Sequence, residues 1–202
     1  MAKATVKSSR KGRETAKPVR LESARLSYLT PPPIECAGDI AAWFQDPEIG
    51  RYLDRPPATV RQAEAAIRNT NNRNRFLFGV FPKGVPTIIG FTHVSVSKRH
   101  RRAKTNSVIG DRSYWGGRHA IEMRAAILDF LFRSCELHKV ASYVYGRNIP
   151  SIFNNKALGY TCESILRDQE IGPDGEYRDL VCFGILREEW LAREREQEPS
   201  IV

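Results

Sequence analysis

The 202-residue chain contains few of the residues that build metal clusters and disulfide frameworks. It has four cysteines and four histidines. The cysteines are Cys36, Cys135, Cys162 and Cys182, and no two of them have the Cys-x-x-Cys spacing typical of zinc sites. We therefore expect no metal site, and four reduced thiols, mostly buried, in a cytoplasmic protein.

The chain also lacks a long hydrophobic run. No segment approaches the roughly 20 apolar residues that a membrane-spanning helix needs. Residues 1–20 are basic and contain no apolar core of the kind found in secretory signals, so we expect neither a signal peptide nor contact with a membrane. The length suits one domain with a full hydrophobic core.

Acidic residues are scarce at one end of the chain. The formal net charge is +9, and residues 1–20 hold seven basic residues against one acidic residue. We predict a disordered basic tail over residues 1–20, a single α/β domain over residues 21–192, and a charged C-terminal tail over residues 193–202. The basic tail is suited to contact with RNA or the ribosome; the alternatives are a solubilising leader and a misassigned start.

Hydrophobic periodicity and turn residues predict the element order β-α-α-β-β-β-α-β-α-β-β. Strands are predicted at residues 19–29, 76–81, 87–96, 105–109, 139–145, 161–167 and 180–186. Helices are predicted at residues 35–44, 59–69, 119–135 and 151–158, and a charged helix over residues 187–196 follows the last strand. Thr59 is the expected N-cap of its helix, and Gly159 is expected just past the end of another. Pro47 is expected to end the first helix, and residues 98–104 form a strongly basic turn.

One segment predicts a phosphate site. The strand over residues 105–109 ends at Gly110, and a turn containing Gly116 and Gly117 precedes the longest helix. Such a turn leaves backbone N–H groups unpaired at a helix N-terminus, which favours a phosphate. The next strand leads to Asn148 and Ser151. We interpret this pattern as the site of a phosphate-bearing cofactor.

A series of short motifs resembles a known family. The motifs, in chain order, are Asp46-Pro47-Glu48, Arg51-Tyr52-Leu53, Ile109-Gly110-Asp111, Tyr114-Trp115-Gly116, Glu122, Asn148, Ser151, Leu158-Gly159-Tyr160, Leu166-Arg167-Asp168, Asp174-Gly175, Tyr177-Arg178-Asp179 and Leu186-Arg187-Glu188-Glu189-Trp190. In this order and spacing the chain resembles the GNAT acetyltransferase superfamily, and most closely its ribosomal-protein-alanine N-acetyltransferase branch. The resemblance covers nearly all of residues 20–191. It implies an α/β (α+β) GNAT fold with a mixed, mostly antiparallel sheet that is splayed at its centre and flanked by helices.

The resemblance also implies a cosubstrate, acetyl-CoA. The Val108–Ile109 backbone would pair with the pantetheine arm and the acetyl carbonyl, residues 115–120 would wrap the pyrophosphate, Asn148 would hydrogen-bond the cofactor, and Ser151 would protonate the leaving thiolate. The implied cofactor-binding residues are Val108, Ile109, Gly110, Arg112, Trp115, Gly116, Gly117, Arg118, His119, Ala120, Asn148 and Ser151.

The implied reaction is direct transfer of acetyl to a primary amine, without an acyl-enzyme. A protein N-terminal amine is our first expectation for the acceptor. The alternatives are a small-molecule amine (an antibiotic, a polyamine or an amino acid) and a non-catalytic CoA-binding or ribosome-associated module. We expect a monomer or a homodimer.

The chain departs from the family pattern at the expected site. Arg118 stands where the phosphate loop of the family has its central glycine, and Asn155 stands where other members have a tyrosine general acid. We therefore name Ser151 as acid. No carboxylate lies on the strand over residues 105–109, so Asp168 is the candidate base, with Asp111 or a water chain as alternatives.

Four of these residues have structural alternatives. Asn148 and Ser151 can instead form a turn and a helix N-cap, and Trp115 can be a packing residue. Glu122 is expected to be a capping or salt-bridge residue.

Overall fold

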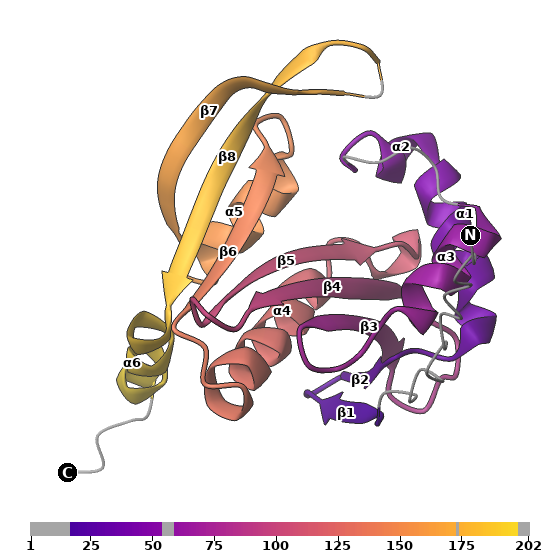
Figure 1. Ribbon diagram of the computed structural model, residues 1–202, viewed down its shortest axis with the longest axis horizontal. Coiled ribbons are helices and arrows are strands. Elements are labelled where there is room, and N and C mark those ends of the chain that lie inside the picture. The colour runs from indigo at the N-terminus through magenta and orange to yellow at the C-terminus, as the bar shows by residue number, and fades with distance from the viewer. Residues whose placement is uncertain (1–16, 54–58, 173, 198–202) are drawn as a thin grey trace, which may run out of the picture.

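The computed structural model describes residues 17–53, 59–172 and 174–197. Eight strands form one sheet in the order β1-β2-β3-β4-β5-β6-β8-β7 (Figure 1). The strands are β1 (Val19–Glu22), β2 (Leu26–Thr30), β3 (Arg75–Pro82), β4 (Gly90–Ser97), β5 (Arg102–Ile109), β6 (Lys139–Tyr145), β7 (Thr161–Ile171) and β8 (Tyr177–Leu186). Neighbouring strands are antiparallel, except that β5 and β6 are parallel.

The sheet opens between its two parallel strands. β5 and β6 pair only from Arg102↔Lys139 to Lys104↔Ala141. Beyond these positions the strands separate, and β6, β8 and β7 leave the direction of the first five strands (Figure 1). The predicted mixed sheet with a splayed centre is therefore confirmed.

Helices cover both faces of the sheet. They are α1 (Ala37–Gln45), α2 (Pro47–Gly50), α3 (Val60–Arg68), α4 (His119–Asp129), α5 (Ile149–Ala157) and α6 (Arg187–Gln197), with short helical turns η1 (Ile34–Cys36), η2 (Arg112–Tyr114) and η3 (Phe130–Ser134). Side chains alternate between the faces along β3. Phe76 and Phe78 pack with α4, and Leu77 packs with α1 and α3.

Several local predictions are confirmed. Thr59 caps α3 in a capping box, in which its Oγ1 accepts the Gln62 N–H and the Gln62 side chain accepts the Thr59 N–H. Gly159 has a φ of +82° just past α5. β6 spans the predicted residues 139–145.

Other boundaries differ for identifiable reasons. Residues 19–29 form a hairpin, β1–β2, instead of one strand. Pro47 begins α2, because the Asp46 side chain caps it by accepting the Glu48 and Ile49 N–H groups. The long predicted helix ends in a π-helical turn, η3, and β5 begins at Arg102, inside the segment predicted as a basic turn.

The predicted tails overlap ordered elements. β1 begins at Val19, and the Lys17 carbonyl accepts a hydrogen bond from the Asn72 amide. Residues 1–16, which carry most of the predicted basic tail, lie outside the described residues. α6 extends to Gln197, and Arg193 donates to the Ala157 carbonyl. Within the described residues, no helix is both long and apolar enough to cross a membrane.

All four cysteines are free thiols. Cys36 and Cys182 are buried, Cys135 is half-buried and Cys162 is exposed. Burial, together with the nearby Asp39 and Glu35, raises the pKa of the Cys36 thiol to about 11. Cys36 is therefore protonated and unreactive at neutral pH.

Candidate active site

A cavity of about 520 Å³ lies where β5 and β6 diverge. Its walls come from β5, the N-terminal turns of α4, β6, α5, α2 and β7. Of the residues predicted to bind the cofactor, nine line it: Val108, Ile109, Trp115, Gly116, Arg118, His119, Ala120, Asn148 and Ser151. The cavity thus brings the two predicted halves of the site together. Gly110, Arg112 and Gly117 are not among its lining residues, and neither is the predicted base Asp168.

Unpaired backbone groups of β5 face the cavity. The Arg101 carbonyl accepts the His138 N–H at the foot of β6, and the Gly110 N–H donates to Ile89 beside β4. Backbone N–H and C=O groups alternate in direction along a strand. Those of Ile109 therefore point toward β6, and those of Val108 point toward β4. The Ile109 carbonyl accepts the Trp115 indole N–H at 2.9 Å. The backbone N–H of Ile109 is therefore the group left for a ligand. This corrects the predicted role of the Val108 backbone, which pairs with Phe91.

The N-terminus of α4 supplies further donors. The N–H groups of residues 116–120 have no acceptor in the described part of the chain. Arg118 precedes the helix in the left-handed conformation, with φ +60° and no side-chain cap. Glycine adopts this left-handed backbone conformation without strain, whereas in arginine it costs about 1–2 kcal/mol of folding free energy. The five N–H groups and the Arg118 charge suit a phosphate group.

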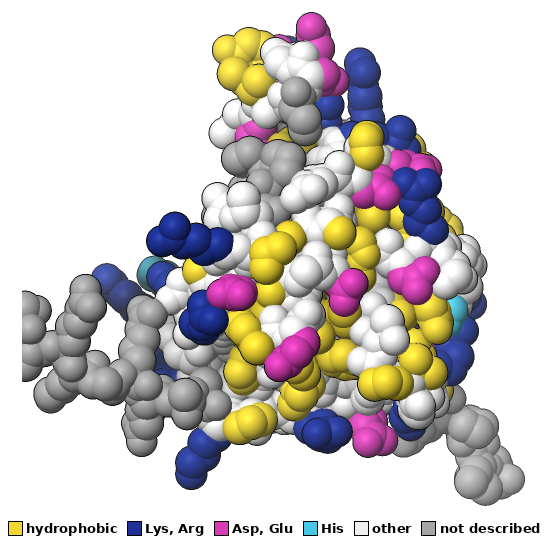
Figure 2. Space-filling model, turned by 90° about the vertical axis from the view of Figure 1, so that its right-hand side faces the viewer, with side chains coloured by type: hydrophobic (Ala, Val, Ile, Leu, Met, Phe, Trp, Pro, Cys, Tyr) yellow, Lys and Arg dark blue, Asp and Glu magenta, His cyan; other side chains and the backbone are white. Residues whose placement is uncertain are grey.

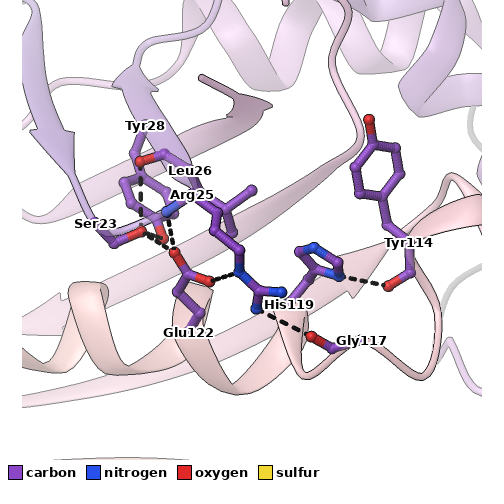
Figure 3. A network of polar contacts seen from close by, with 8 residues as sticks. All are labelled: Ser23, Arg25, Leu26, Tyr28, Tyr114, Gly117, His119 and Glu122. Carbon is purple, nitrogen blue, oxygen red and sulfur yellow. Dashed lines mark hydrogen bonds and ion pairs between the residues drawn. The ribbon is translucent and has the colours of Figure 1, made fainter. Parts of the chain in front are cut away.

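A polar network holds this loop against the first hairpin (Figure 3). The Glu122 carboxylate accepts three hydrogen bonds of 2.7 Å, from the Ser23 hydroxyl, the Arg25 N–H and the Arg25 guanidinium. The same guanidinium donates to the Gly117 carbonyl at 3.0 Å, and His119 Nδ1 contacts the Tyr114 carbonyl at 3.0 Å. Glu122 therefore positions the loop, as expected for a salt-bridge residue.

The Glu122 carboxyl remains ionised in this network. Burial acts to raise its pKa, but the hydrogen bonds from Arg25 and Ser23 outweigh burial and lower the pKa below its ordinary value. The contact is therefore charge-assisted at neutral pH, which makes it one of the stronger links between α4 and the hairpin.

Two residues predicted to bind the cofactor make structural contacts. A Cβ on Gly110 would lie 2.0 Å from the Trp43 ring, so the absence of a side chain lets α1 approach β5. Arg112 forms ion pairs with Asp46 at 2.7 Å and Glu48 at 2.6 Å. The Arg112 hydrogen bond lowers the pKa of the Asp46 carboxyl. These contacts hold α1 and α2 beside the cavity.

Asn148 and Ser151 combine the two roles that the sequence left open. The Asn148 Oδ1 atom accepts the Ser151 N–H at 3.2 Å and so caps α5. Both residues also line the cavity. Because the cap uses only the amide oxygen, the two N–H donors of the Asn148 side chain remain for a ligand.

The far side of the cavity carries charged and aromatic side chains. Lys104 lies over the Tyr143 ring at 4.7 Å, and Arg51 lies over the Tyr52 ring at 4.7 Å. The carboxylates that line the cavity are Glu48, which is paired with Arg112, and Glu170 on β7, for which no ion pair occurs among the described residues.

The predicted base Asp168 does not share this position. It lies in an irregular stretch of β7 with φ +48°, where its N–H donates to Asp179. The irregularity adds two residues between Leu166 and Glu170, so Glu170 lies opposite Arg178, where Asp168 would lie in a regular strand. The sequence contained no signal for this shift.

Arg124 on α4 was also missed. It lines the cavity, and its guanidinium donates to Asn155 Oδ1 at 3.1 Å and to Ser142 Oγ at 3.4 Å. A signal did exist, because Arg124 stands at helical spacing between Ile121 and Leu128, on the face predicted to be apolar. A charged residue on such a face indicates either an exception in the packing or a site.

The sequence is similar to known acetyltransferases. The family model of the acetyltransferase (GNAT) domain matches residues 27–161. The chain is 28% identical over 165 residues to the uncharacterized N-acetyltransferase p20 of Bacillus licheniformis. This alignment covers 78% of this chain and 90% of that protein.

Solved structures share the fold. The spermidine N-acetyltransferase of Vibrio cholerae in complex with CoA and spermine superposes with a TM-score of 0.75 at 19% identity, covering 84% of this chain and 99% of that one. The ribosomal-protein-S5-alanine acetyltransferase of Vibrio fischeri gives a TM-score of 0.72 at 17% identity, covering 85% of this chain and 98% of that one. At these identities the structural likeness concerns the fold alone.

Proposed function

The chain belongs to the GNAT acetyltransferase family, and on that premise we propose that it moves an acetyl group from acetyl-CoA to the α-amine of a protein N-terminus. That the protein is an acyl-transferring enzyme using acetyl-CoA follows from its family. Our proposal concerns which amine accepts the acetyl group. The observation that carries our proposal is the cavity, which joins the free N–H groups of α4 to the carboxylate of Glu170.

The donor half of the reaction would use backbone groups. The N–H groups of residues 116–120 and the Arg118 charge would hold the phosphates of acetyl-CoA. The amides of Asn148 and the hydroxyl of Ser151 would contact the pantetheine arm. The Ile109 N–H would then stabilise the negative charge that develops on the acetyl oxygen when the amine attacks.

The acceptor half would use Glu170. The attacking amine must be neutral, so a base has to remove its proton. Glu48 is held by Arg112, whereas Glu170 has no ion pair among the described residues. We assign the proton to the Glu170 carboxylate, from which it passes to solvent.

The charge of the cavity favours an α-amine over a polyamine. Arg51 and Lys104 on the acceptor side repel an acceptor that carries several ammonium groups. An α-amine has an ordinary pKa of about 7.7–8.0, against about 10.4 for an alkyl ammonium such as that of lysine. The α-amine therefore loses its proton at much lower cost in this cationic site.

The edge of the sheet favours a peptide over a free amino acid. β7 is the outer strand beside β8, and almost all of its residues are exposed. Its outer backbone groups are suited to pair with an extended chain whose N-terminus enters the cavity beside Glu170.

The proposal is tested by incubating the protein and acetyl-CoA with three acceptor classes: peptides with a free N-terminus, spermidine, and free amino acids. Product mass and thiol release are both measured. We expect the peptides to be acetylated, and the same peptides with a blocked N-terminus to be inert. Faster acetylation of spermidine or of a free amino acid would reject the protein acceptor.

Glu170→Gln tests the base in the same assay. We expect kcat to fall about 100-fold, because proton removal from the amine loses its acceptor. Asp168→Asn is the matched control, since asparagine tolerates a left-handed backbone and residue 168 does not line the cavity. A fall in kcat for Asp168→Asn with none for Glu170→Gln would restore the original prediction.

A further inference from the structure

Arg124 presents a positive charge inside the cavity without a negative partner. Its guanidinium is held by the neutral side chains of Asn155 and Ser142, and no carboxylate pairs with it among the described residues. Burial lowers the pKa of the guanidinium, but an arginine stays protonated in proteins. A half-buried cation without a counter-charge costs free energy, so this arrangement points to an anionic group on a ligand.

The surroundings of Arg124 are otherwise uncharged. Asn155 is fully buried and Ser142 is 1% exposed, and the nearby Tyr160 is buried with its phenol against Thr105. Burial raises the pKa of Tyr160, so the phenol stays neutral and supplies no counter-charge. The guanidinium is therefore fixed in direction by two hydrogen bonds while its charge remains unneutralised.

The position of Arg124 separates it from the phosphate end of the site. It lies one helical turn, about 6 Å along the α4 axis, beyond Ala120, the last residue whose N–H is free. It reaches toward Ser142 on β6, at the gap where β5 and β6 diverge. The Ile109 N–H faces the same gap, and Glu170 marks the acceptor side. Between the phosphates and the acetyl carbonyl, the only cofactor atom that becomes an anion is the sulfur.

We propose that the Arg124 guanidinium accepts the negative charge of the coenzyme A sulfur as the thioester breaks. This assignment rests on the cofactor half of the proposed function and is independent of the acceptor. The amine nitrogen attacks the acetyl carbon, and the new C–N bond forms as the C–S bond breaks. The sulfur keeps the electron pair and leaves as a thiolate beside the guanidinium, and the nitrogen loses its proton to Glu170.

This arrangement accounts for a missing acid. Asn155 stands where a tyrosine donates a proton in related enzymes, and the Ser151 hydroxyl is a poor acid. With Arg124 beside the sulfur, the thiolate needs no proton donor, and Asn155 positions the guanidinium by accepting its hydrogen bond. Arg124 therefore replaces the catalytic role first assigned to Ser151.

Binding measurements test the proposal without any acceptor. Calorimetry compares coenzyme A with desulfo-coenzyme A, which lacks the sulfur, from pH 6 to 9.5. If the pKa of the bound thiol is lowered by one unit, the affinity for coenzyme A relative to desulfo-coenzyme A rises about tenfold as pH passes from well below to well above the ordinary thiol pKa of about 8.5. We expect this rise in the wild type, a flat ratio in Arg124→Gln, and a partial rise in Arg124→Lys.

Arg118→Gln is the matched control. It removes another cavity cation near the phosphates, so it should weaken both ligands equally and leave the pH dependence of their ratio intact. Equal loss of both ligands in Arg124→Gln, or an unchanged pH dependence in that variant, would overturn the proposal. If Arg124→Gln does not fold, the ultraviolet absorbance of the bound thiolate in the wild type decides: a bound thiol pKa equal to that of free coenzyme A rejects the role of Arg124.

Discussion

Two of the arginines that line the cavity, Arg118 and Arg124, differ in backbone conformation and in the environment of their charge. Arg124 sits in a regular helix, and only its charge is unusual. Arg118 has ordinary solvent access for its charge, but its backbone is strained at φ +60°. In the sequence, Arg118 stands where the phosphate loop of the family has its central glycine. The structure shows that the loop adopts the glycine-like conformation with arginine in place, so the cost lies in the stability of the fold.

Exchanging Arg118 separates strain from charge. We expect Arg118→Gly to stabilise the protein by about 1 kcal/mol, because glycine adopts a positive φ without strain. This corresponds to a rise in Tm of about 2–4 °C for a domain of this size. Arg118→Gln keeps the strain and loses the charge, so its Tm should not rise.

Calorimetry with acetyl-CoA completes the comparison. Both variants should bind several-fold more weakly than the wild type, because each loses the same charge near the phosphates. Tighter binding by Arg118→Gly alone would mean that the arginine side chain obstructs the loop.

At the scale of elements, local signals predicted the segments whose stabilising contacts are local. The N-cap at Thr59 and the β6 strand depend on neighbouring residues, and both appear where they were predicted. The break between β1 and β2 depends on Glu122, whose bonds to Ser23 and Arg25 span 97–99 residues. The irregularity that brings Glu170 to the cavity depends on the pairing of β7 with β8. Such contacts leave no periodic pattern in the sequence.

Glu122→Gln tests how much the α4–hairpin link contributes. We expect the free energy of unfolding at pH 7 to fall by about 2 kcal/mol, because a charge-assisted network is broken in a partly buried position. Glu64→Gln is the control: it removes an exposed pair with Arg68 on α3, and should cost less than about 0.5 kcal/mol.

The pH dependence of the same variants has a defined sign. The folded-state pKa of Glu122 lies below its ordinary value of about 4.3, so its contribution is complete above that pH and is lost as pH falls through the folded pKa. The stability difference between the wild type and Glu122→Gln should therefore shrink below about pH 4 in denaturant titrations. A difference that stays constant down to pH 3 would show that Glu122 acts by packing alone.

At the scale of the whole molecule, β5 is the wall shared by both halves of the site. On one face, α4 and α5 carry the groups proposed to bind acetyl-CoA, and on the other, α1 and α3 form a second core with Val108. On the side shown in Figure 2, the acidic and basic side chains of the described residues are interspersed among hydrophobic ones. The charge that we propose to act in the reaction is that of Arg124 at the cavity, and the composition gives no indication of its position.

Gly110→Ala tests whether the two faces communicate through β5. The new Cβ would lie 2.0 Å from the Trp43 ring, which itself stacks on Phe91 at 6.2 Å, so α1 or the end of β5 must move. We expect a loss of about 1–3 kcal/mol in stability from overpacking. We also expect a lower kcat, because Ile109, whose N–H is proposed to stabilise the acetyl oxygen, is the adjacent residue.

Gly38→Ala on α1 is the control: it makes the same chemical change, and we expect the opposite effect on stability. No atom lies within 4 Å of the Cβ it would add, and alanine favours a helix over glycine by about 0.5–1 kcal/mol, so this variant should be slightly more stable and fully active. If Gly110→Ala lost stability but kept the wild-type kcat at temperatures where it is folded, then α1 would support the fold without positioning the end of β5. A parallel fall in both quantities would show that the packing of Trp43 on one face sets the geometry of the reaction on the other.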